Sequence, residues 1–290
     1  MTPGEGVGKQ HLLDVGNGVQ VNYFDTGGPG LPVVILHGLA GSATEFFATA
    51  RALTGFRTSL VELRGHGRST TSPGDLSREA FVADVVHVIE TAVAAPVALV
   101  GQSMGGHTAM LVAAKRPDLV SRLVLLESGA GGSSHMENMQ LGEFFRSWPV
   151  PFSSRPAARD FLGPGPLAEA WAADLEEKAG GFWPRFHPDV MVGIMHALIQ
   201  PRWKEWQSVR APTLVVYGEN GMFSEEEKTA FVASRPETQR VDLPAASHDA
   251  HLDAFESWMA ALNTFLGNPL SPQGSADTKA ADKGRQPGLH

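Results

Sequence analysis

The chain has 290 residues, of which 42% are apolar and 19% charged, and its formal net charge is -8. This length suffices for one large domain with a buried core, and the acidic balance argues against a nucleic-acid binder, which normally carries a basic surface to neutralise phosphates. The absence of cysteine excludes disulfides and thiolate-bound metals, and no apolar stretch approaches the roughly 20 residues that a membrane-spanning helix needs.

The elements expected nearest the N-terminus are strands. The pair Asn17-Gly18 lies between two runs with β character and predicts the turn of an antiparallel hairpin over residues 11–24. An apolar run at 33–36 and a weaker one at 57–63 predict two further strands. Runs that are apolar throughout are typical of strands buried on both faces, as in a parallel sheet.

Helices and strands then alternate along the chain. Residues 77–93 carry valine and isoleucine at helical spacing after Ser77, a suitable N-cap, and an apolar run follows at 97–100. A second helix is expected over 105–115, ending before a proline, and another strand at 123–126. This order predicts an α/β fold with a mostly parallel twisted sheet and helices on both faces.

Residues 129–207 interrupt this alternation. They contain five of the six tryptophans and several prolines, but no run typical of a buried strand, and they predict an inserted helical cap. The strand pattern resumes at 214–217 and 238–243, so the main domain is expected over 10–128 and 208–267. Most cap aromatics are expected to pack the cap onto the main domain. Four of its residues are candidates for a substrate pocket, namely Trp148, Trp183, His187 and His196.

The two ends of the chain differ in composition from the rest. Residues 1–9 are rich in glycine and polar side chains, and residues 268–290 combine proline, glycine, serine and charge with almost no aliphatic residues. Such segments bury too little apolar surface to become ordered, so both are predicted to be disordered tails. The N-terminus shows no secretory signal pattern, which makes the cytoplasm the expected location.

A nucleophile motif lies between the strand at 97–100 and the helix that follows. Gly101-Gln102-Ser103-Met104-Gly105 has the G-x-S-x-G pattern in the order strand, turn, helix. The two glycines permit a tight turn that holds Ser103 at a helix N-terminus, where the helix dipole favours developing negative charge. The alternative is a turn whose serine only caps the helix.

With three further motifs, the chain resembles the α/β-hydrolase superfamily over about residues 10–267. These motifs are His37-Gly38-Leu39-Ala40-Gly41-Ser42, Glu62-Leu63-Arg64-Gly65-His66-Gly67-Arg68-Ser69 and Ser247-His248. The resemblance implies an α/β-hydrolase fold and an oxyanion hole formed by the backbone N–H groups of Leu39 and Met104. It also implies that the segment with two arginines is a conformational loop rather than an anion site.

Three histidines are candidates for the general base that activates Ser103. His248 follows the apolar run at 238–243 by a short loop of small residues, where the family places its catalytic histidine. His251 falls at the start of the next helix and is expected to be structural or to line the pocket. His107 lies one turn into the helix after Ser103, where a packed histidine is more common than a base.

The acid that orients the base has two candidates. The commonest branch of the family has an aspartate in a G-x-x-D pattern after the strand at 214–217, but this chain has Gly218-Glu219-Asn220-Gly221. Glu219 lies on that loop. Glu127 ends the strand at 123–126, where certain haloalkane dehalogenases and the zearalenone lactone hydrolases carry their acid. We favour Glu127, whose longer side chain can reach the histidine, over Glu219, and the alternative is that Glu127 only orients nearby loops.

These residues predict hydrolysis of a carboxylic ester by Ser103, His248 and Glu127 through an acyl-enzyme. Lactone or carbon–carbon bond hydrolysis by the same triad is the alternative among enzymes, and a non-catalytic, receptor-like ligand-binding protein is the alternative outside them. A dehalogenase or epoxide hydrolase would normally have an aspartate as nucleophile. No cofactor, metal, nucleic acid or membrane is expected as a partner, only a small-molecule ester or lactone.

Overall fold

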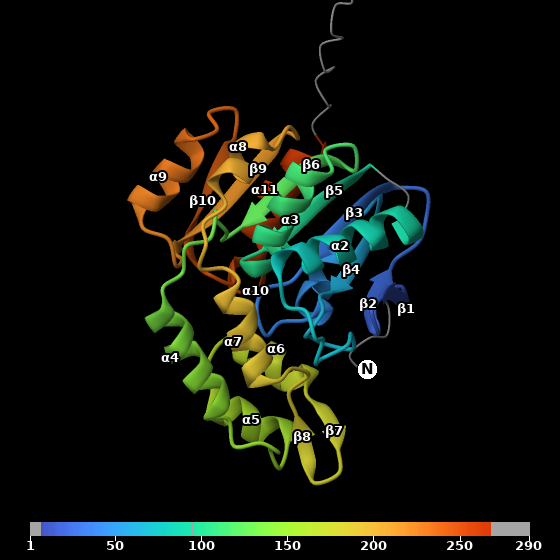
Figure 1. Cartoon of the computed structure of the whole chain (residues 1–290), viewed down its shortest axis with the longest axis vertical. Helices are drawn as coiled ribbons and strands as arrows, with labels where there is room; N and C mark the ends of the chain where they lie inside the picture. Colours follow the sequence, from blue (N-terminus) through green and yellow to red (C-terminus); the bar gives the residue numbers. More distant parts are fainter. Residues whose placement is uncertain (1–6, 94–95, 268–290) are drawn as a thin grey trace, which may run out of the picture.

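A single eight-stranded sheet forms the centre of the computed structural model, which describes residues 7–93 and 96–267 (Figure 1). In spatial order the strands are β1 (Lys9–Gly16), β2 (Val19–Asp25), β4 (Phe56–Glu62), β3 (Leu31–Leu36), β5 (Val97–Gln102), β6 (Val120–Leu126), β9 (Thr213–Asn220) and β10 (Gln239–Ser247). The pairs β1–β2 and β2–β4 are antiparallel and the others are parallel. The mostly parallel sheet predicted from the apolar runs is confirmed.

The predicted N-terminal hairpin is confirmed as β1 and β2. Asn17 and Gly18 have φ angles of 54° and 73°, and positive φ at both central residues is what a type I′ turn requires. The predicted tails at 1–9 and 268–290 lie outside the described residues except for 7–9. In that short piece Val7 is buried and Lys9 already begins β1, so order starts earlier than the composition predicts.

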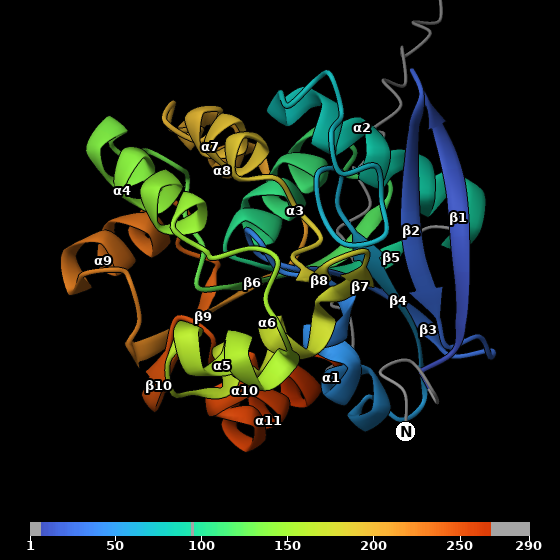
Figure 2. The same cartoon turned by 90° about the horizontal axis from the view of Figure 1, so that it is seen from below.

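Two layers of helices cover the sheet, because its strands are apolar on both faces. Val34 and Leu36 pack into one core and Val33 and Ile35 into the other, as alternation along a strand requires. In Figure 2 the sheet separates α2, α3 and α8 from α1, α10 and α11. These helices are α1 (Phe47–Ala52), α2 (Arg78–Val88), α3 (Met104–Lys115), α8 (Trp203–Ser208), α10 (Ala250–Asp253) and α11 (Phe255–Gly267).

Short elements complete the main domain. A 3-10 helix, η1 (Ala43–Phe46), precedes α1, and a π-helical segment, η2 (Ile89–Val93), continues α2. Helix α9 (Glu225–Ala233) connects β9 to β10. The predicted helices at 77–93 and 105–115 are confirmed, and Ser77 accepts a hydrogen bond from the amide of Ala80 as an N-cap.

The inserted segment lies at one end of the sheet (Figure 1). It consists of α4 (His135–Arg146), α5 (Arg155–Leu162), α6 (Pro166–Asp174), the short hairpin β7 (Glu176–Lys178) and β8 (Gly181–Trp183), and α7 (Pro188–His196). The segment is therefore not wholly helical. It also ends earlier than residue 207, because α8 packs on the main domain, where Trp206 is fully buried and stacks on Phe231 of α9.

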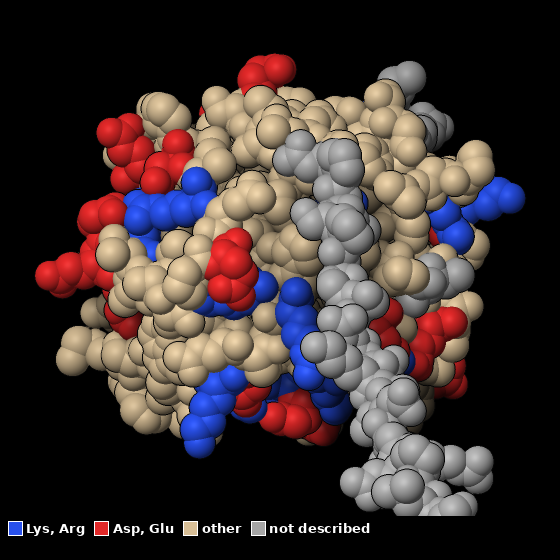
Figure 3. Space-filling model, turned by 90° about the horizontal axis from the view of Figure 1, so that it is seen from above, with Lys and Arg blue, Asp and Glu red and all other residues tan. Residues whose placement is uncertain are grey.

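The end of the molecule opposite this insertion carries acidic and basic side chains interspersed with uncharged ones (Figure 3). On the part of this face that is not covered by grey atoms, no continuous basic patch is visible. Among the described residues no helix is both long and apolar enough to cross a membrane.

Candidate active site

Ser103 occupies a sharp turn between β5 and α3. Its φ and ψ of 52° and -119° are rare for a residue with a side chain. The flanking glycines are required, because a Cβ at Gly101 would lie 2.4 Å from the Gly105 carbonyl oxygen and a Cβ at Gly105 would lie 2.3 Å from the His37 carbonyl oxygen. The turn leaves Ser103 partly exposed while Gln102 and Met104 on either side are buried.

The parallel register brings the end of β6 beside Ser103. The amide of Ser103 donates to the Leu126 carbonyl oxygen at 2.9 Å, and the amide of the next residue, Glu127, donates to Val216 of β9 at 2.8 Å. Glu127 is fully buried and has a φ of 48°. Three neighbouring strands therefore end together, and their carboxyl ends form the floor of the candidate site.

The Glu127 carboxylate contacts His248. Its Oε2 lies 3.1 Å from His248 Nδ1 and also accepts from the Met222 amide at 3.0 Å, while Oε1 accepts from the Gly218 amide at 2.7 Å. A carboxylate held by two backbone donors has a fixed position, and it favours the imidazole tautomer with its proton on Nδ1. The structure thus brings together two of the three predicted triad residues, Glu127 and His248.

Gly221 explains why Glu127 fits. A Cβ at Gly221 would lie 2.1 Å from Glu127 Oε1 and 2.5 Å from its carboxyl carbon. The aspartate that the family's commonest G-x-x-D pattern has at this position would therefore collide with Glu127. In the sequence, Gly221 indicates only that the usual aspartate is absent. In the structure, it provides the space for the Glu127 carboxylate, which comes from the end of β6.

Glu219, the second candidate acid, makes a different contact. Its exposed carboxylate accepts from the amide of Ala245 at 2.8 Å, three residues before His248. Among the described residues, Glu219 makes no hydrogen bond or ion pair with the His248 ring. The hydrogen bond to the Ala245 amide holds the loop that carries His248 in place.

Gln102 connects the Ser103 turn to the same loop. Its Nε2 donates to the His248 carbonyl oxygen at 3.2 Å, and Asp249 Oδ1 lies 3.5 Å away. We expect Gln102→Leu, which removes the donor but keeps the volume, to lower kcat/KM of the hydrolase activity about fivefold, because one hydrogen bond of this kind contributes about 1 kcal/mol. Kinetics with an ester substrate measure the effect, and Gln239→Leu, at an exposed site on β10, is the control. An unchanged kcat/KM would contradict a positioning role.

The loop after β3 passes against Ser103. A Cβ at Gly38 would lie 3.5 Å from Ser103 Cβ. His37 fixes this loop: its Nε2 accepts from the Leu63 amide at 3.0 Å, and its Nδ1 therefore carries the proton and donates to the Gly38 carbonyl oxygen at 2.7 Å. Burial lowers the pKa of His37 to about 4, which keeps the ring neutral.

The two predicted oxyanion donors come from this loop and from α3. Leu39 directly follows Gly38, and Met104 is the first residue of α3. Amides in the first turn of a helix have no acceptor within the helix, so the Met104 N–H is free for a ligand oxygen. Both amides thus belong to segments that adjoin Ser103.

The other two candidate bases, His107 and His251, are buried. Burial lowers the pKa of His251 to about 4, and its ring stacks on Phe46 with centroids 4.2 Å apart. Burial, with a smaller effect of the Arg78 and Arg202 charges, lowers the pKa of His107 well below its usual value. Both rings are neutral and packed, whereas the His248 side chain is 30% exposed.

Both arginines of the loop at 62–69 pair with carboxylates of this chain. Arg64 forms two hydrogen bonds of 2.6 Å with Asp84, and Arg68 pairs with Glu62 at 2.7 Å. These contacts agree with the prediction of a conformational loop.

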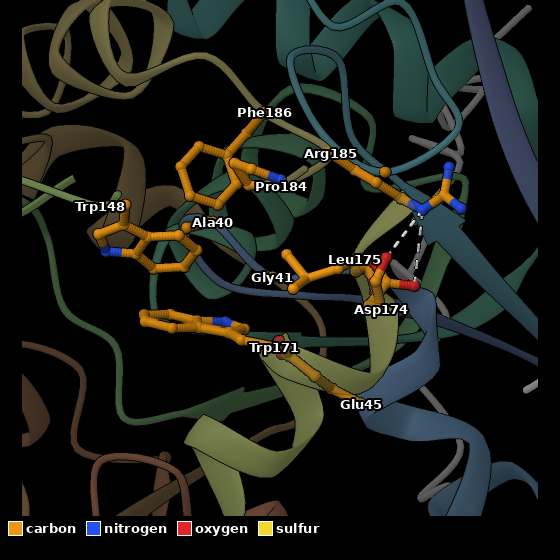
Figure 4. A pocket seen from close by; sticks show the side chains of 12 residues that line it. Ala40, Gly41, Glu45, Trp148, Trp171, Asp174, Leu175, Pro184, Arg185 and Phe186 are labelled. Atoms are coloured by element: carbon orange, nitrogen blue, oxygen red, sulfur yellow. Dashed lines mark hydrogen bonds and ion pairs between the residues drawn. The ribbon is translucent and has the colours of Figure 1, made fainter. Parts of the chain in front are cut away.

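A small aromatic pocket lies beyond the Leu39 loop, between the main domain and the insertion (Figure 4). Trp148, Trp171 and Phe186 form its aromatic walls, and Ala40 and Gly41 lie on the main-domain side. Its free space of about 20 Å³ holds about one water-sized group. Trp148 is the one of the four predicted pocket residues that lines it.

The remaining predicted pocket residues lie elsewhere. Trp183 and His187 line a larger hollow beside β7 and β8, and His196 at the end of α7 packs against His135 with ring centroids 5.2 Å apart. That these three residues line a substrate pocket stays a prediction. The charged residues of the aromatic pocket, Glu45, Asp174 and Arg185, were not predicted, because they carry no periodic signal in the sequence.

The family model described as "alpha/beta hydrolase fold" matches residues 32–255. An sn-1-specific diacylglycerol lipase of Mus musculus is 32% identical over 251 residues, covering 81% of this chain and 80% of the lipase. A 2-hydroxy-6-oxononadienedioate/2-hydroxy-6-oxononatrienedioate hydrolase of Burkholderia vietnamiensis is 35% identical over 135 residues, covering 44% and 47%. Among solved structures, E-2-(acetamidomethylene)succinate hydrolase superposes with a TM-score of 0.81 at 22% identity, covering 90% of this chain and 99% of that one.

Proposed function

Since the chain belongs to the alpha/beta hydrolase fold family, we propose that it is a serine hydrolase that cleaves a carboxylic ester through an acyl-enzyme on Ser103. The observation that carries the proposal is the contact between Glu127 Oε2 and His248 Nδ1 at 3.1 Å beside the strained turn of Ser103. A buried acid that orients a partly exposed histidine near a serine is the arrangement that activates a serine hydroxyl.

The proposed mechanism assigns one role to each group. His248 Nε2 takes the proton of the Ser103 hydroxyl as its oxygen attacks the substrate carbonyl, and then returns it to the leaving alcohol. Glu127 stabilises the imidazolium formed in between. The N–H groups of Leu39 and Met104 donate to the oxyanion, and in such sites one donor typically contributes about 3–4 kcal/mol to the transition state. Water activated by His248 releases the acyl group.

An ester is favoured by a relative that matches most of the chain. The mouse protein is named as a diacylglycerol lipase, and its match extends over four fifths of both chains. The second candidate is hydrolysis of a carbon–carbon bond or a lactone by the same residues. It is supported by the bacterial relative, whose named substrate contains a ketone and two carboxylates but no ester.

Hydrolysis of a matched panel tests the proposal. The purified chain is incubated with short- and medium-chain esters, a monoacylglycerol and a diacylglycerol, lactones and a 6-oxo dienoate, and a fluorophosphonate probe is applied in parallel. We expect turnover of esters and a probe adduct on Ser103. Turnover of the oxo-dienoate alone would support the second candidate. The absence of both turnover and labelling would overturn the enzyme assignment.

A further inference from the structure

Glu45 is a buried carboxylate that faces the aromatic pocket without a cationic partner. Its side chain is 4% exposed, it lines the pocket, and a Cβ at Gly41 would lie 2.7 Å from its Oε2. The nearest basic group recorded for it is His251 Nε2 at 3.8 Å, and that ring is neutral because its pKa is about 4. Within residues 7–93 and 96–267, no lysine or arginine forms an ion pair with Glu45.

The surroundings of Glu45 contain more acid than base. Asp174, at the end of α6, is shared by Arg68 at 3.4 Å and Arg185 at 3.9 Å, as the dashed lines to Arg185 in Figure 4 illustrate. Burial raises the pKa values of Asp174 and of Glu62 and Asp249 nearby. Burial, with a smaller effect of the Asp174 charge, raises the pKa of Glu45 to about 8. Arg185, the basic residue among those that line the pocket, is thus paired with other acids and not with Glu45.

The walls of the pocket suit a small cation. The Trp148 and Trp171 rings have centroids 5.5 Å apart, and Phe186 lies 5.4 Å from Trp148 (Figure 4). Aromatic faces attract cations through their negative quadrupole, most strongly for tryptophan. The free space holds about one water-sized group. A primary ammonium group has that size, whereas a trimethylammonium group is several times larger.

We propose that this pocket binds a primary ammonium group of the substrate, with Glu45 as its counter-ion and Trp148 and Trp171 as its aromatic walls. Ala40, which lines the pocket, directly follows the proposed oxyanion donor Leu39 in the sequence. The inference therefore deepens the proposed function and rests on it: the substrate class is an ester that carries an amine several bonds from its carbonyl. Arg185 is paired with Asp174 and, at 3.5 Å, with Glu176. Glu45 accepts hydrogen bonds from neutral donors, the Trp171 side chain and the Ser42 backbone, so its charge is available to the ligand.

Binding to an inactive variant separates this inference from the hydrolase proposal. In the Ser103→Ala background, titration calorimetry at pH 9.5, above the pKa of Glu45, compares hexylammonium with hexan-1-ol, which has the same chain and no charge. We expect hexylammonium to bind about tenfold or more tightly than the alcohol, and Glu45→Gln to remove this preference. Glu169→Gln, an exposed acid on α6 that changes the net charge equally, is the matched control. Equal affinities, or a preference that survives Glu45→Gln, would overturn the inference.

The pH dependence gives a second, independent measurement. Raising the pH from 6.5 to 9.5 ionises Glu45, whereas hexylammonium stays largely charged because alkylamines titrate near pH 10.4. The preference for hexylammonium is expected to increase with pH through about 8. The groups that face Glu45 from its neighbours are Asp174, Arg185, His251 and Asp249, and Glu45→Gln retains all of them. The same rise in Glu45→Gln would assign the effect to these groups and contradict a role for Glu45.

Kinetics with the active chain then connect the pocket to catalysis. Methyl 6-aminohexanoate and methyl heptanoate differ by an ammonium in place of a methyl group. We expect the amino ester to have the higher kcat/KM, and Glu45→Gln to reduce the ratio of the two values about tenfold. If hexylammonium binds but neither ester is cleaved, the hydrolase proposal fails and the pocket stands. If both esters are cleaved equally well, the pocket assignment fails and the hydrolase stands.

Discussion

Ser103→Ala is expected to lower kcat by at least about four orders of magnitude and to leave the melting temperature almost unchanged. The loss is large because the variant has no nucleophile, and His248 and Glu127 alone do not form an acyl-enzyme. The fold is retained because the Ser103 side chain is partly exposed and its structural contacts are made by the backbone: its carbonyl oxygen accepts from Ser128 Oγ at 2.9 Å. Activity on the best ester of the panel and thermal unfolding by circular dichroism measure the two effects.

A control variant and the position of the fluorophosphonate adduct show whether the loss of activity is specific to Ser103. Ser121→Ala removes a serine hydroxyl on β6 that bonds the Val97 carbonyl oxygen, away from the carboxyl ends of the strands, and is expected to keep full activity. Mass spectrometry of the fluorophosphonate adduct locates the reactive hydroxyl. A Ser103→Ala variant that retains more than about 1% of kcat, or an adduct on another residue, would exclude Ser103 as the nucleophile.

The strands of the main domain could be predicted because their residues repeat a simple constraint. A strand buried on both faces must be apolar at every position, and β3, β5, β6 and β9 each show such a run. The Ser103 turn was predictable for a similar reason. Glycines are needed wherever two backbones approach closely, and those of G-x-S-x-G lie at such points.

The structure of the insertion could not be predicted in the same way. The hairpin β7–β8 has only three residues in each strand and is partly exposed, so it leaves no run of apolar residues in the sequence. Trp206 counted as a cap aromatic by composition, yet it is buried in the main domain against α9. Which aromatic residues meet in the pocket depends on how α4 and α6 pack against residues 40–45. No periodic pattern in the sequence predicts this packing.

Glu45 illustrates the same limit for charged residues. A glutamate in a short helical turn such as η1 ordinarily indicates a solvated surface, and a buried one is exceptional unless it is paired. Nothing in the local sequence distinguishes it, because Asp174 and the tryptophans around it are more than 100 residues away in the chain. Buried acids of this kind become visible only when the tertiary structure is known.

Glu127→Gln is expected to lower kcat about 10³- to 10⁴-fold, whereas Glu219→Gln is expected to change it less than about tenfold. Glutamine at 127 cannot stabilise the imidazolium of His248, and its amide nitrogen would face the N–H of Gly218 or Met222. At Glu219, the amide oxygen of glutamine can still accept from Ala245. Steady-state kinetics with one ester compare the two variants. A loss confined to Glu219→Gln would assign the acid to Glu219.

Moving the acid to another position in the site tests the role of Glu127 by a gain of activity and not only by a loss. Gly221→Asp by itself is expected to be inactive or unstable, since its Cβ would lie 2.1 Å from Glu127 Oε1. Removing that carboxylate in the double variant Glu127→Gly, Gly221→Asp frees the space, and glycine tolerates the φ of 48° at position 127. The aspartate then occupies the place that the commonest branch of the family uses.

We expect the double variant to have a kcat at least about tenfold higher than that of Glu127→Gly alone, because the two positions supply one carboxylate to the same imidazole nitrogen. If both variants are equally inactive although the double variant folds, the role of Glu127 is not simply to orient His248.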